Sequence, residues 1–262
     1  MSAAATYLDA ILEDHRGQAA ADHRPIEDLV RSARAMDPAR GFGAALRVAT
    51  GLGVVSEVKR RSPSKGALAL DLDPAALAER YEAGGATCLS VLTDERWFGG
   101  SAADLVAARA AIGLPVLRKD FTVGPHDVCD ARLMGADCVL LIAAALDDTE
   151  LASLHDLAVE IGIDALVEVH DEAEVDRALA VGATLIGVNQ RDLVTFEVDT
   201  ERAVRVAPCI PDDLVRVAES GIRGPADAAR LADAGYHAVL VGESLVTSGD
   251  PAEAVAALRS AG

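Results

Sequence analysis

The stretch MGADCVLLI, residues 134–142, decides the fold of this chain, because it joins a helix-ending glycine directly to a buried apolar run. The same pattern returns as GGATCLSVL at 84–92, VGATLIGV at 181–188 and AGYHAVLVG at 234–242, about 50 residues apart. Each interval has room for a further apolar run and two helices. Short apolar runs that alternate with helical segments are typical of βα units in a parallel sheet.

Counting these apolar runs predicts a strand number. The predicted strands are 54–58, 86–92, 115–120, 138–144, 164–169, 185–190, 214–220 and 238–243. Eight strands, each followed by a helix, favour an α/β fold with one closed (βα)8 TIM barrel over an open doubly wound sheet of roughly five or six strands. The turn after the first run, KRRSPSKG, lacks the GxGxxG pattern, which argues against nicotinamide binding.

The segment 1–48 precedes the barrel, which we expect to occupy 49–262. YLDAILEDHRGQAAADH has apolar Leu8, Ile11 and Leu12 on one side, as an amphipathic helix should, and PIEDLVRSARAM predicts a second such helix. Neither has a partner strand. We therefore expect an N-terminal helical extension packed on the barrel, not a second domain.

Composition excludes several classes of partner. The formal net charge of -18 repels phosphodiester backbones and anionic lipid, so we expect no nucleic-acid and no membrane partner. No run reaches the ~18 apolar residues of a membrane span, and the N-terminus has no signal-peptide pattern, which predicts a cytoplasmic protein. Oligomeric state stays open between a monomer and a weak homodimer.

Cysteine and histidine spacing gives no sign of a metal site. Cys88, Cys129, Cys138 and Cys209 form no CxxC pair, and we expect them to be buried small hydrophobes, not disulfides or zinc ligands. The six histidines form no HxH or HExxH pattern. The sequence predicts no metal.

Lysine use points to the chemistry. The chain has three lysines, Lys59, Lys65 and Lys119, against 21 arginines. Lysine is the basic side chain whose pKa shifts readily on burial, and two of the three follow apolar runs, so we expect lysine to be reserved for catalysis. A compositional bias toward arginine is the alternative.

Active sites of such barrels lie at the carboxyl ends of the strands. Glu57 and Lys59 are two residues apart and so share one face of a strand, where each affects the pKa of the other. Glu168 follows four apolar residues and must be paired or functional. The alternatives are a structural salt bridge for the first pair and a satisfied ion pair between Lys119 and Asp120. Other strand ends add Thr93, Asp94, Leu140, Asn189, Arg191, Glu219 and Ser220.

The loops after the seventh and eighth strands, ESGIRGP and VGESLV, predict a phosphate pocket. Glycines there let backbone amides approach an anion, and hydroxyls of the first loop, Ser62 and Ser64, would add donors. Ordinary turn glycines are the alternative. The candidate phosphate-binding residues are Ser62, Gly221, Gly242, Glu243 and Ser244.

Several motifs together resemble the indole-3-glycerol phosphate synthase family over nearly the whole chain. They are YLDAILEDHR, EVKRRSPSKG, LTDERWFGGS, LRKDF, LVEVHDE, GVNQRDL, VAESGI and VGESL. Together, EVKRRSPSKG, LRKDF and the NQRDL part of GVNQRDL are highly specific to this family, because neighbouring phosphate-binding barrels share only the two glycine loops. Trp97 stands where the family often has a phenylalanine.

The resemblance implies an activity in tryptophan biosynthesis. It is the ring closure of 1-(2-carboxyphenylamino)-1-deoxyribulose 5-phosphate to indole-3-glycerol phosphate, with loss of carbon dioxide and water. It also implies a phosphorylated small-molecule substrate and no cofactor. Other barrel enzymes are the competing hypotheses: a phosphoribosyl anthranilate isomerase, which would want a Cys/Asp pair, or a lysine Schiff-base aldolase. A non-enzymatic metabolite-binding barrel is a third.

The same resemblance assigns roles. Lys119 is the implied general acid, Glu168 its acid/base partner, and Glu57 with Lys59 the second acid/base pair. The candidate catalytic residues are Lys119, Glu168, Lys59, Glu57, Asn189 and Ser220. Phe98 and Phe121 are expected to wall the phenyl ring, since aromatic residues are scarce and these two flank the site in sequence. The candidate substrate-binding residues are Arg191, Glu219, Phe98, Phe121, Leu140 and Leu193.

Overall fold

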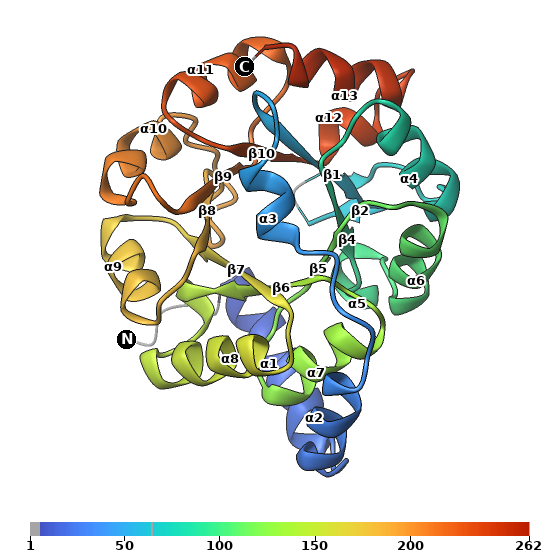
Figure 1. The fold of residues 1–262 in the computed structure, drawn as a ribbon, viewed down its shortest axis with the longest axis vertical. Helices are drawn as coiled ribbons and strands as arrows, with labels where there is room; N and C mark the ends of the chain where they lie inside the picture. The colour runs from blue at the N-terminus through green and yellow to red at the C-terminus, as the bar shows by residue number, and fades with distance from the viewer. Residues whose placement is uncertain (1–5, 64, 262) are drawn as a thin grey trace.

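The computed structural model describes residues 6–63 and 65–261. Within these residues, eight parallel strands close into a barrel in the order β1-β10-β9-β8-β7-β6-β5-β4 (Figure 1). The strands are β1 (Gly53–Val58), β4 (Cys88–Leu92), β5 (Val116–Lys119), β6 (Cys138–Ile142), β7 (Asp164–Val169), β8 (Leu185–Asn189), β9 (Val215–Glu219) and β10 (Ala238–Val241). The predicted TIM barrel is confirmed.

An outer ring of helices covers the barrel. It is formed by α4 (Pro74–Ala83), α6 (Ala102–Ala111), α7 (Pro125–Leu133), α8 (Asp148–Glu160), α9 (Glu172–Ala180), α10 (Arg202–Val206), α11 (Pro225–Asp233) and α13 (Pro251–Arg259). Their starts are encoded locally. Asp73 caps α4 ahead of a proline in the first turn, and Asp147 forms a capping box with Glu150 at α8.

The strands alternate between two apolar layers. Val54 faces the helices, whereas Val55, Cys88, Leu117 and Leu166 belong to the cluster inside the barrel. Side chains of alternating strand positions thus fill the interior as a packed core. Three of the four cysteines are buried as predicted. The prediction for Cys209 was wrong: it is exposed, because the chain turns there through a short 3-10 segment, Ala207–Cys209.

Two predicted strands ran too far. The run 138–144 was expected to be strand throughout, but β6 ends at Ile142, whose ladder partner is Glu168 of β7, and Ala143–Ala145 form a 3-10 turn leading to α8. The run 238–243 likewise stops at Val241, and α12 (Glu243–Val246) begins immediately. Apolarity alone predicts no strand end, because apolar residues such as Ala143 also form the 3-10 turn that follows β6.

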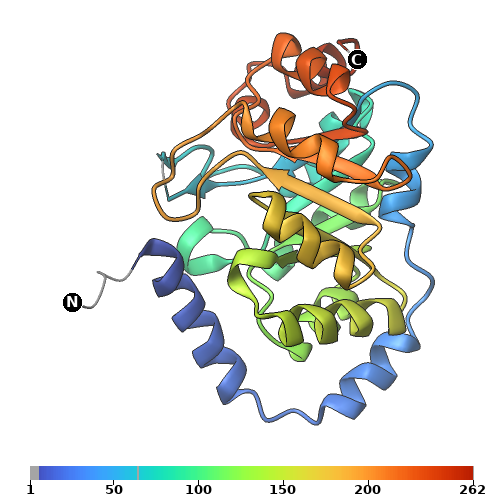
Figure 2. The same ribbon diagram turned by 90° about the vertical axis from the view of Figure 1, so that its left-hand side faces the viewer.

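The N-terminal segment wraps the barrel from one end to the other. α1 (Tyr7–Ala21) crosses the end where the site lies, α2 (Ile26–Arg34) packs on α7, and the chain continues to α3 (Phe42–Arg47) (Figure 2). α3 was not predicted. Its Phe42 and Leu46 are buried in the interior cluster at the amino ends of the strands, so it closes that end.

Two smaller elements shape the other end. A hairpin, β2 (Arg61–Ser62) with β3 (Gly66–Ala67), lies in the loop after β1, and α5 (Glu95–Phe98) follows β4. Neither was predicted. None of the helices in the described part of the chain has the length and apolarity that a bilayer crossing requires.

Candidate active site

A cavity of about 910 Å³ opens at the carboxyl ends of the barrel strands. Every predicted site residue lies on its wall: Glu57, Lys59, Ser62, Phe98, Lys119, Phe121, Leu140, Glu168, Asn189, Arg191, Leu193, Glu219, Ser220, Gly221, Gly242, Glu243 and Ser244. Ser64 lies outside the described residues. The closed barrel gathers these positions because parallel strands direct all their carboxyl ends to one rim.

A partly buried lysine and two buried carboxylates form the centre of the cavity. Lys119 Nζ lies 2.9 Å from Glu168 Oε2 and 3.5 Å from Glu219 Oε2. Asn189 Nδ2 donates to Glu168 Oε1 at 2.9 Å. These side chains come from the ends of β5, β7, β8 and β9, so the barrel's strand order places them around one point.

The environment separates the pKa values of these groups. Burial acts to lower the pKa of Lys119, but the carboxylates of Glu168, Glu219 and Glu57 outweigh it, so the pKa of the ammonium is raised. Burial acts to raise the pKa of Glu168, yet Lys119 and His170 lower it on balance. In contrast, burial raises the pKa of Glu219 to about 8, despite the opposing effect of Lys119. The site thus holds an ammonium, a carboxylate and a carboxylic acid near neutral pH.

A second lysine–glutamate pair borders the same cavity. Lys59 Nζ is 2.7 Å from Glu57 Oε1, and Ser90 Oγ donates to Glu57 Oε2 at 3.4 Å. Both side chains border the cavity, so the pair does not close the barrel wall as a purely structural bridge would. Gly242 makes room for it, because a Cβ there would collide with Glu57 Oε1 and lie 3.0 Å from Lys59 Nζ.

The glycine loops have unusual backbone geometry. Ser220 has a φ of 67° and Gly221 a φ of 74°, which places two successive residues in the left-handed region. A serine pays a steric penalty there, and such strain is typical of functional sites. The Ser220 carbonyl accepts from Gln190 Nε2 at 2.7 Å, and Ser244 Oγ donates to the Ile222 carbonyl at 3.1 Å, which ties the two loops together.

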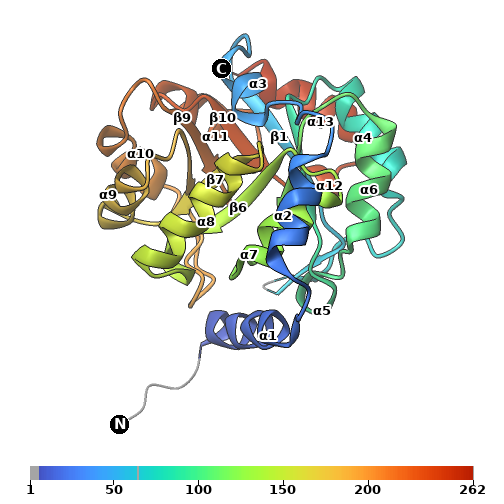
Figure 3. The ribbon, with the colours of Figure 1, turned by 60° about the horizontal axis from the view of Figure 1, so that its bottom comes forward.

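Helix α1 supplies a wall that the sequence did not predict. Tyr7, Leu8 and Ile11 line the cavity, and Figure 3 shows α1 lying across this end of the barrel. The Tyr7 ring packs edge-on against the rings of Trp97 and Phe196, with ring centroids 5.0 Å and 5.1 Å apart. The apolar face of α1 was visible in the sequence, but nothing there showed what would cover it.

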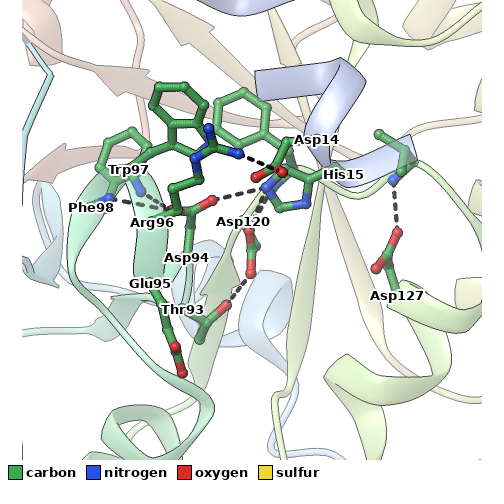
Figure 4. A network of polar contacts seen from close by, with 12 residues as sticks. Asp14, His15, Thr93, Asp94, Glu95, Arg96, Trp97, Phe98, Asp120 and Asp127 are labelled. Atoms are coloured by element: carbon green, nitrogen blue, oxygen red, sulfur yellow. Dashed lines mark hydrogen bonds and ion pairs between the residues drawn. The ribbon is translucent and has the colours of Figure 1, made fainter. Parts of the chain in front are cut away.

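His15 fastens α1 to the rim (Figure 4). Its Nε2 lies 2.9 Å from Asp94 Oδ2 and 3.8 Å from Asp120 Oδ1. Asp94 also caps α5 by accepting from the backbone of Trp97 and Phe98. Burial acts to lower the pKa of His15, but Asp94 and Asp120 outweigh it and the pKa is raised. The His15 ring between two carboxylates thus joins α1 to the barrel.

Among the described residues, these three side chains form the group whose arrangement could ligate a metal ion. His15, Asp94 and Asp120 offer atoms within 4.8 Å of one another. Their bonds are already explained without an ion, because Asp120 pairs with Arg118 at 2.9 Å and accepts from Thr93. We interpret the group as a hydrogen-bonded network. The predicted absence of a metal stays a prediction.

Two aromatic rings lie beside the charged centre. Phe98 and Phe121 both line the cavity, with ring centroids 6.3 Å apart. Trp97 does not border the cavity; it packs against Tyr7 and carries the Arg96 guanidinium 4.9 Å above its ring. A tryptophan at position 97, where a phenylalanine is frequent in similar sequences, therefore does not form part of the cavity wall.

Comparison with known proteins identifies the family. The family model described as "Indole-3-glycerol phosphate synthase" matches residues 8–258. The chain belongs to the indole-3-glycerol phosphate synthase family. Two relatives with that name are those of Rhodococcus jostii strain RHA1 and Mycolicibacterium smegmatis strain ATCC 700084 / mc(2)155. The first is 53% identical over 258 residues, covering 98% of this chain and 96% of the relative. The second is 54% identical over 260 residues, covering 98% and 95%.

Solved structures outside this family support the fold alone. Thiamine phosphate pyrophosphorylase from Pyrococcus furiosus is 16% identical with a TM-score of 0.61, covering 80% of this chain and 95% of its own. The N-acetylmannosamine-6-phosphate 2-epimerase from Clostridium perfringens is 16% identical with a TM-score of 0.60, covering 76% and 89%.

Proposed function

We propose that this protein is an indole-3-glycerol phosphate synthase that converts 1-(2-carboxyphenylamino)-1-deoxyribulose 5-phosphate to indole-3-glycerol phosphate, carbon dioxide and water. The observation that carries the proposal is the contact of Lys119 with the buried Glu168 carboxylate, 2.9 Å long, in a chain of this family. An ammonium and a carboxylate held together in a water-poor cavity are what a reaction with a protonation and a proton abstraction requires.

The first step needs an acid at the ketone. A carbon–carbon bond forms between the ring carbon that bears the carboxylate and the ketone carbon, and the ketone oxygen takes a proton. We assign this proton to Lys119, because its raised pKa keeps the amine charged until a stronger base, the developing alkoxide, is within reach. Phe98 and Phe121 would hold the phenyl ring beside it.

The later steps restore aromaticity. The carboxylate leaves as carbon dioxide and its bonding electrons return to the ring. An acid then protonates the hydroxyl, which leaves as water, and a base removes a proton from the substrate. Lys59 or Arg191 is the cation proposed to hold the carboxylate. Glu168 and the Glu57–Lys59 pair are assigned jointly to the proton transfers, since both border the cavity.

The substrate phosphate is assigned to the glycine loops. In barrels of this kind the loops after the seventh and eighth strands and the amino end of a short helix bind phosphate. Here those loops follow β9 and β10, and the short helix is α12. Gly221 and Gly242 leave the backbone accessible on the cavity side, and Ser62 and Ser244 add hydroxyls.

The competing activities fit the site less well. A Schiff-base aldolase needs an unprotonated amine, whereas the neighbouring carboxylates raise the pKa of Lys119. A phosphoribosyl anthranilate isomerase would want a cysteine acid, and no cysteine of the described residues lines the cavity. A non-enzymatic barrel would retain its function in Lys119→Ala and Glu168→Gln variants.

Mixing the purified protein with the carboxyphenylamino substrate and following indole fluorescence tests the proposal. We expect fluorescence to rise with wild-type protein and not with Glu168→Gln. Absence of product from folded wild-type protein and authentic substrate would reject the assignment. A cytoplasmic location, a monomer or weak homodimer, and residues 1–48 as an extension of the one barrel domain stay predictions.

A further inference from the structure

His170 lies directly behind the proposed acid/base carboxylate and takes part in none of the steps above. It follows β7, two residues beyond Glu168, and it does not line the cavity. Its Nε2 lies 3.7 Å from Glu168 Oε1. This nitrogen is buried and makes no hydrogen bond to any described residue. A buried polar atom left without a hydrogen bond, and aimed at a buried carboxylate, calls for a physical explanation.

The other ring nitrogen determines the tautomer. His170 Nδ1 is 3.0 Å from Glu174 Oε2, and the same oxygen accepts from the His170 backbone at 2.7 Å. An ionised carboxylate only accepts hydrogen bonds, so Nδ1 carries a hydrogen. In the neutral ring, Nε2 would then present a lone pair to the Glu168 oxygen, which is repulsive. Protonation of Nε2 turns that repulsion into attraction.

The charges around the ring favour the protonated form. Glu168 faces it from β7, Glu174 from α9, and Arg202 acts from α10. Burial acts to lower the pKa of His170, and Arg202 adds to this effect, but the two glutamates outweigh both and the pKa is raised. In return, the charge of His170 is second only to that of Lys119 in lowering the pKa of Glu168.

We propose that His170, held by Glu174, is a positioning residue whose imidazolium keeps Glu168 ionised and its carboxylate fixed for proton transfer. Each Glu168 oxygen is then engaged: Oε2 by Lys119, and Oε1 by Asn189 with His170 behind it. This arrangement leaves the carboxylate little freedom to rotate. The inference rests on the proposed function, because Glu168 matters here as an acid/base group.

A pH profile separates this role from a structural one. In His170→Gln an amide stays near the position of Nε2 but the charge is lost, so the pKa of Glu168 rises. The acidic limb of the kcat profile should move to higher pH by about one unit or more, with roughly tenfold lower kcat at the acidic end and recovery at alkaline pH. KM should change little, since His170 does not border the cavity.

The matched control is His155→Gln. His155 is also buried, its Nδ1 likewise lacks a hydrogen bond among the described residues, and it lies on α8 away from the cavity. Its variant should keep the wild-type limb. An unmoved limb in folded His170→Gln, or a loss of kcat that is uniform across pH, would overturn the proposal. Should His170→Gln fail to fold, Glu174→Gln takes its place and should move the limb in the same direction.

A substrate-free measurement keeps the two proposals distinguishable. Titration of the His170 ring by NMR in the free wild-type protein should show a hydrogen on Nδ1, a charged ring at neutral pH, and a midpoint that falls in Glu174→Gln. A neutral ring at pH 7 overturns the inference whatever the enzyme's activity. Failure of wild-type protein to form indole product, with the ring charged as expected, would reject the proposed function and not the charge of His170.

Discussion

Replacing Lys119 with methionine removes the central ammonium while retaining most of the side chain's volume. Lys119 Nζ lies within 3.5 Å of two buried carboxylates, Glu168 and Glu219, so the change also leaves two acids facing each other. Glu219 already holds a proton near neutral pH, so the pKa that should rise is that of Glu168, which loses the charge that lowers it most; this weakens the proposed base. Loss of a general acid alone lowers rates about 10²- to 10⁴-fold, or about 3–5 kcal/mol at 1.36 kcal/mol per tenfold.

The assay is indole fluorescence under saturating substrate, with KM determined in parallel. We expect kcat to fall by at least the lower of these factors and KM to change modestly, because a transition-state contact is lost. The control is Arg109→Met, which breaks a buried ion pair of 2.9 Å with Asp137 at the opposite end of the barrel. It should lower stability and retain kcat. Wild-type kcat with a raised KM in Lys119→Met would refute the acid role and leave only a positioning role.

Three further outcomes follow from the structure. Gly242→Ala should lower kcat about 10- to 100-fold, because the added Cβ would displace Glu57. The control Gly249→Ala has open space around the added Cβ and should retain kcat. Equal kcat values for the two variants would disprove the predicted displacement of Glu57. His15→Asn should lower the free energy of unfolding in urea by about 1–3 kcal/mol, and by more at pH 6 than at pH 9. The pKa of His15 is raised in the fold, so the protonated ring stabilises the fold at pH values below its pKa in the unfolded chain. This stabilisation is lost as the pH rises through the pKa of the folded protein. With a pKa near 8 in the fold, Glu219 releases a proton on unfolding between about pH 4 and 8, so it makes the free energy of unfolding fall as pH rises through that range. Glu219→Gln should make this fall less steep. An unchanged slope would argue that Glu219 is ionised in the fold.

The barrel could be predicted because its signals are local. Several βα units carry an apolar run, a residue that caps the helix, such as Asp73 or Asp147, and a glycine after the helix; Gly85 and Gly135 have the positive φ that such a helix end favours. Strand ends were less predictable. β6 stops at Ile142 although the apolar run continues, because Ala143–Ala145 turn into a 3-10 helix. Cys209 was wrongly expected to be buried, since its neighbours' apolarity says nothing about a turn.

The site was predictable in outline for the same reason. Lys119 and Glu168 stand at strand ends, and a closed parallel barrel leads every strand end to one rim. Their pairing within 2.9 Å, and the contrast between the low pKa of Glu168 and the raised one of Glu219, depend on distances that no spacing along the chain encodes.

What the sequence determined by itself was therefore periodic: eight strands, their helices, and the charged groups at their ends. Only the tertiary structure decided the contacts between segments far apart in the chain. His15 meets Asp94 across 79 positions, α3 closes the far end of the barrel, and His170 turns an unbonded nitrogen toward Glu168. The physical reason is that periodic burial and capping act over a few neighbouring residues, whereas Coulomb and packing energies depend on positions in space that the closed barrel alone establishes.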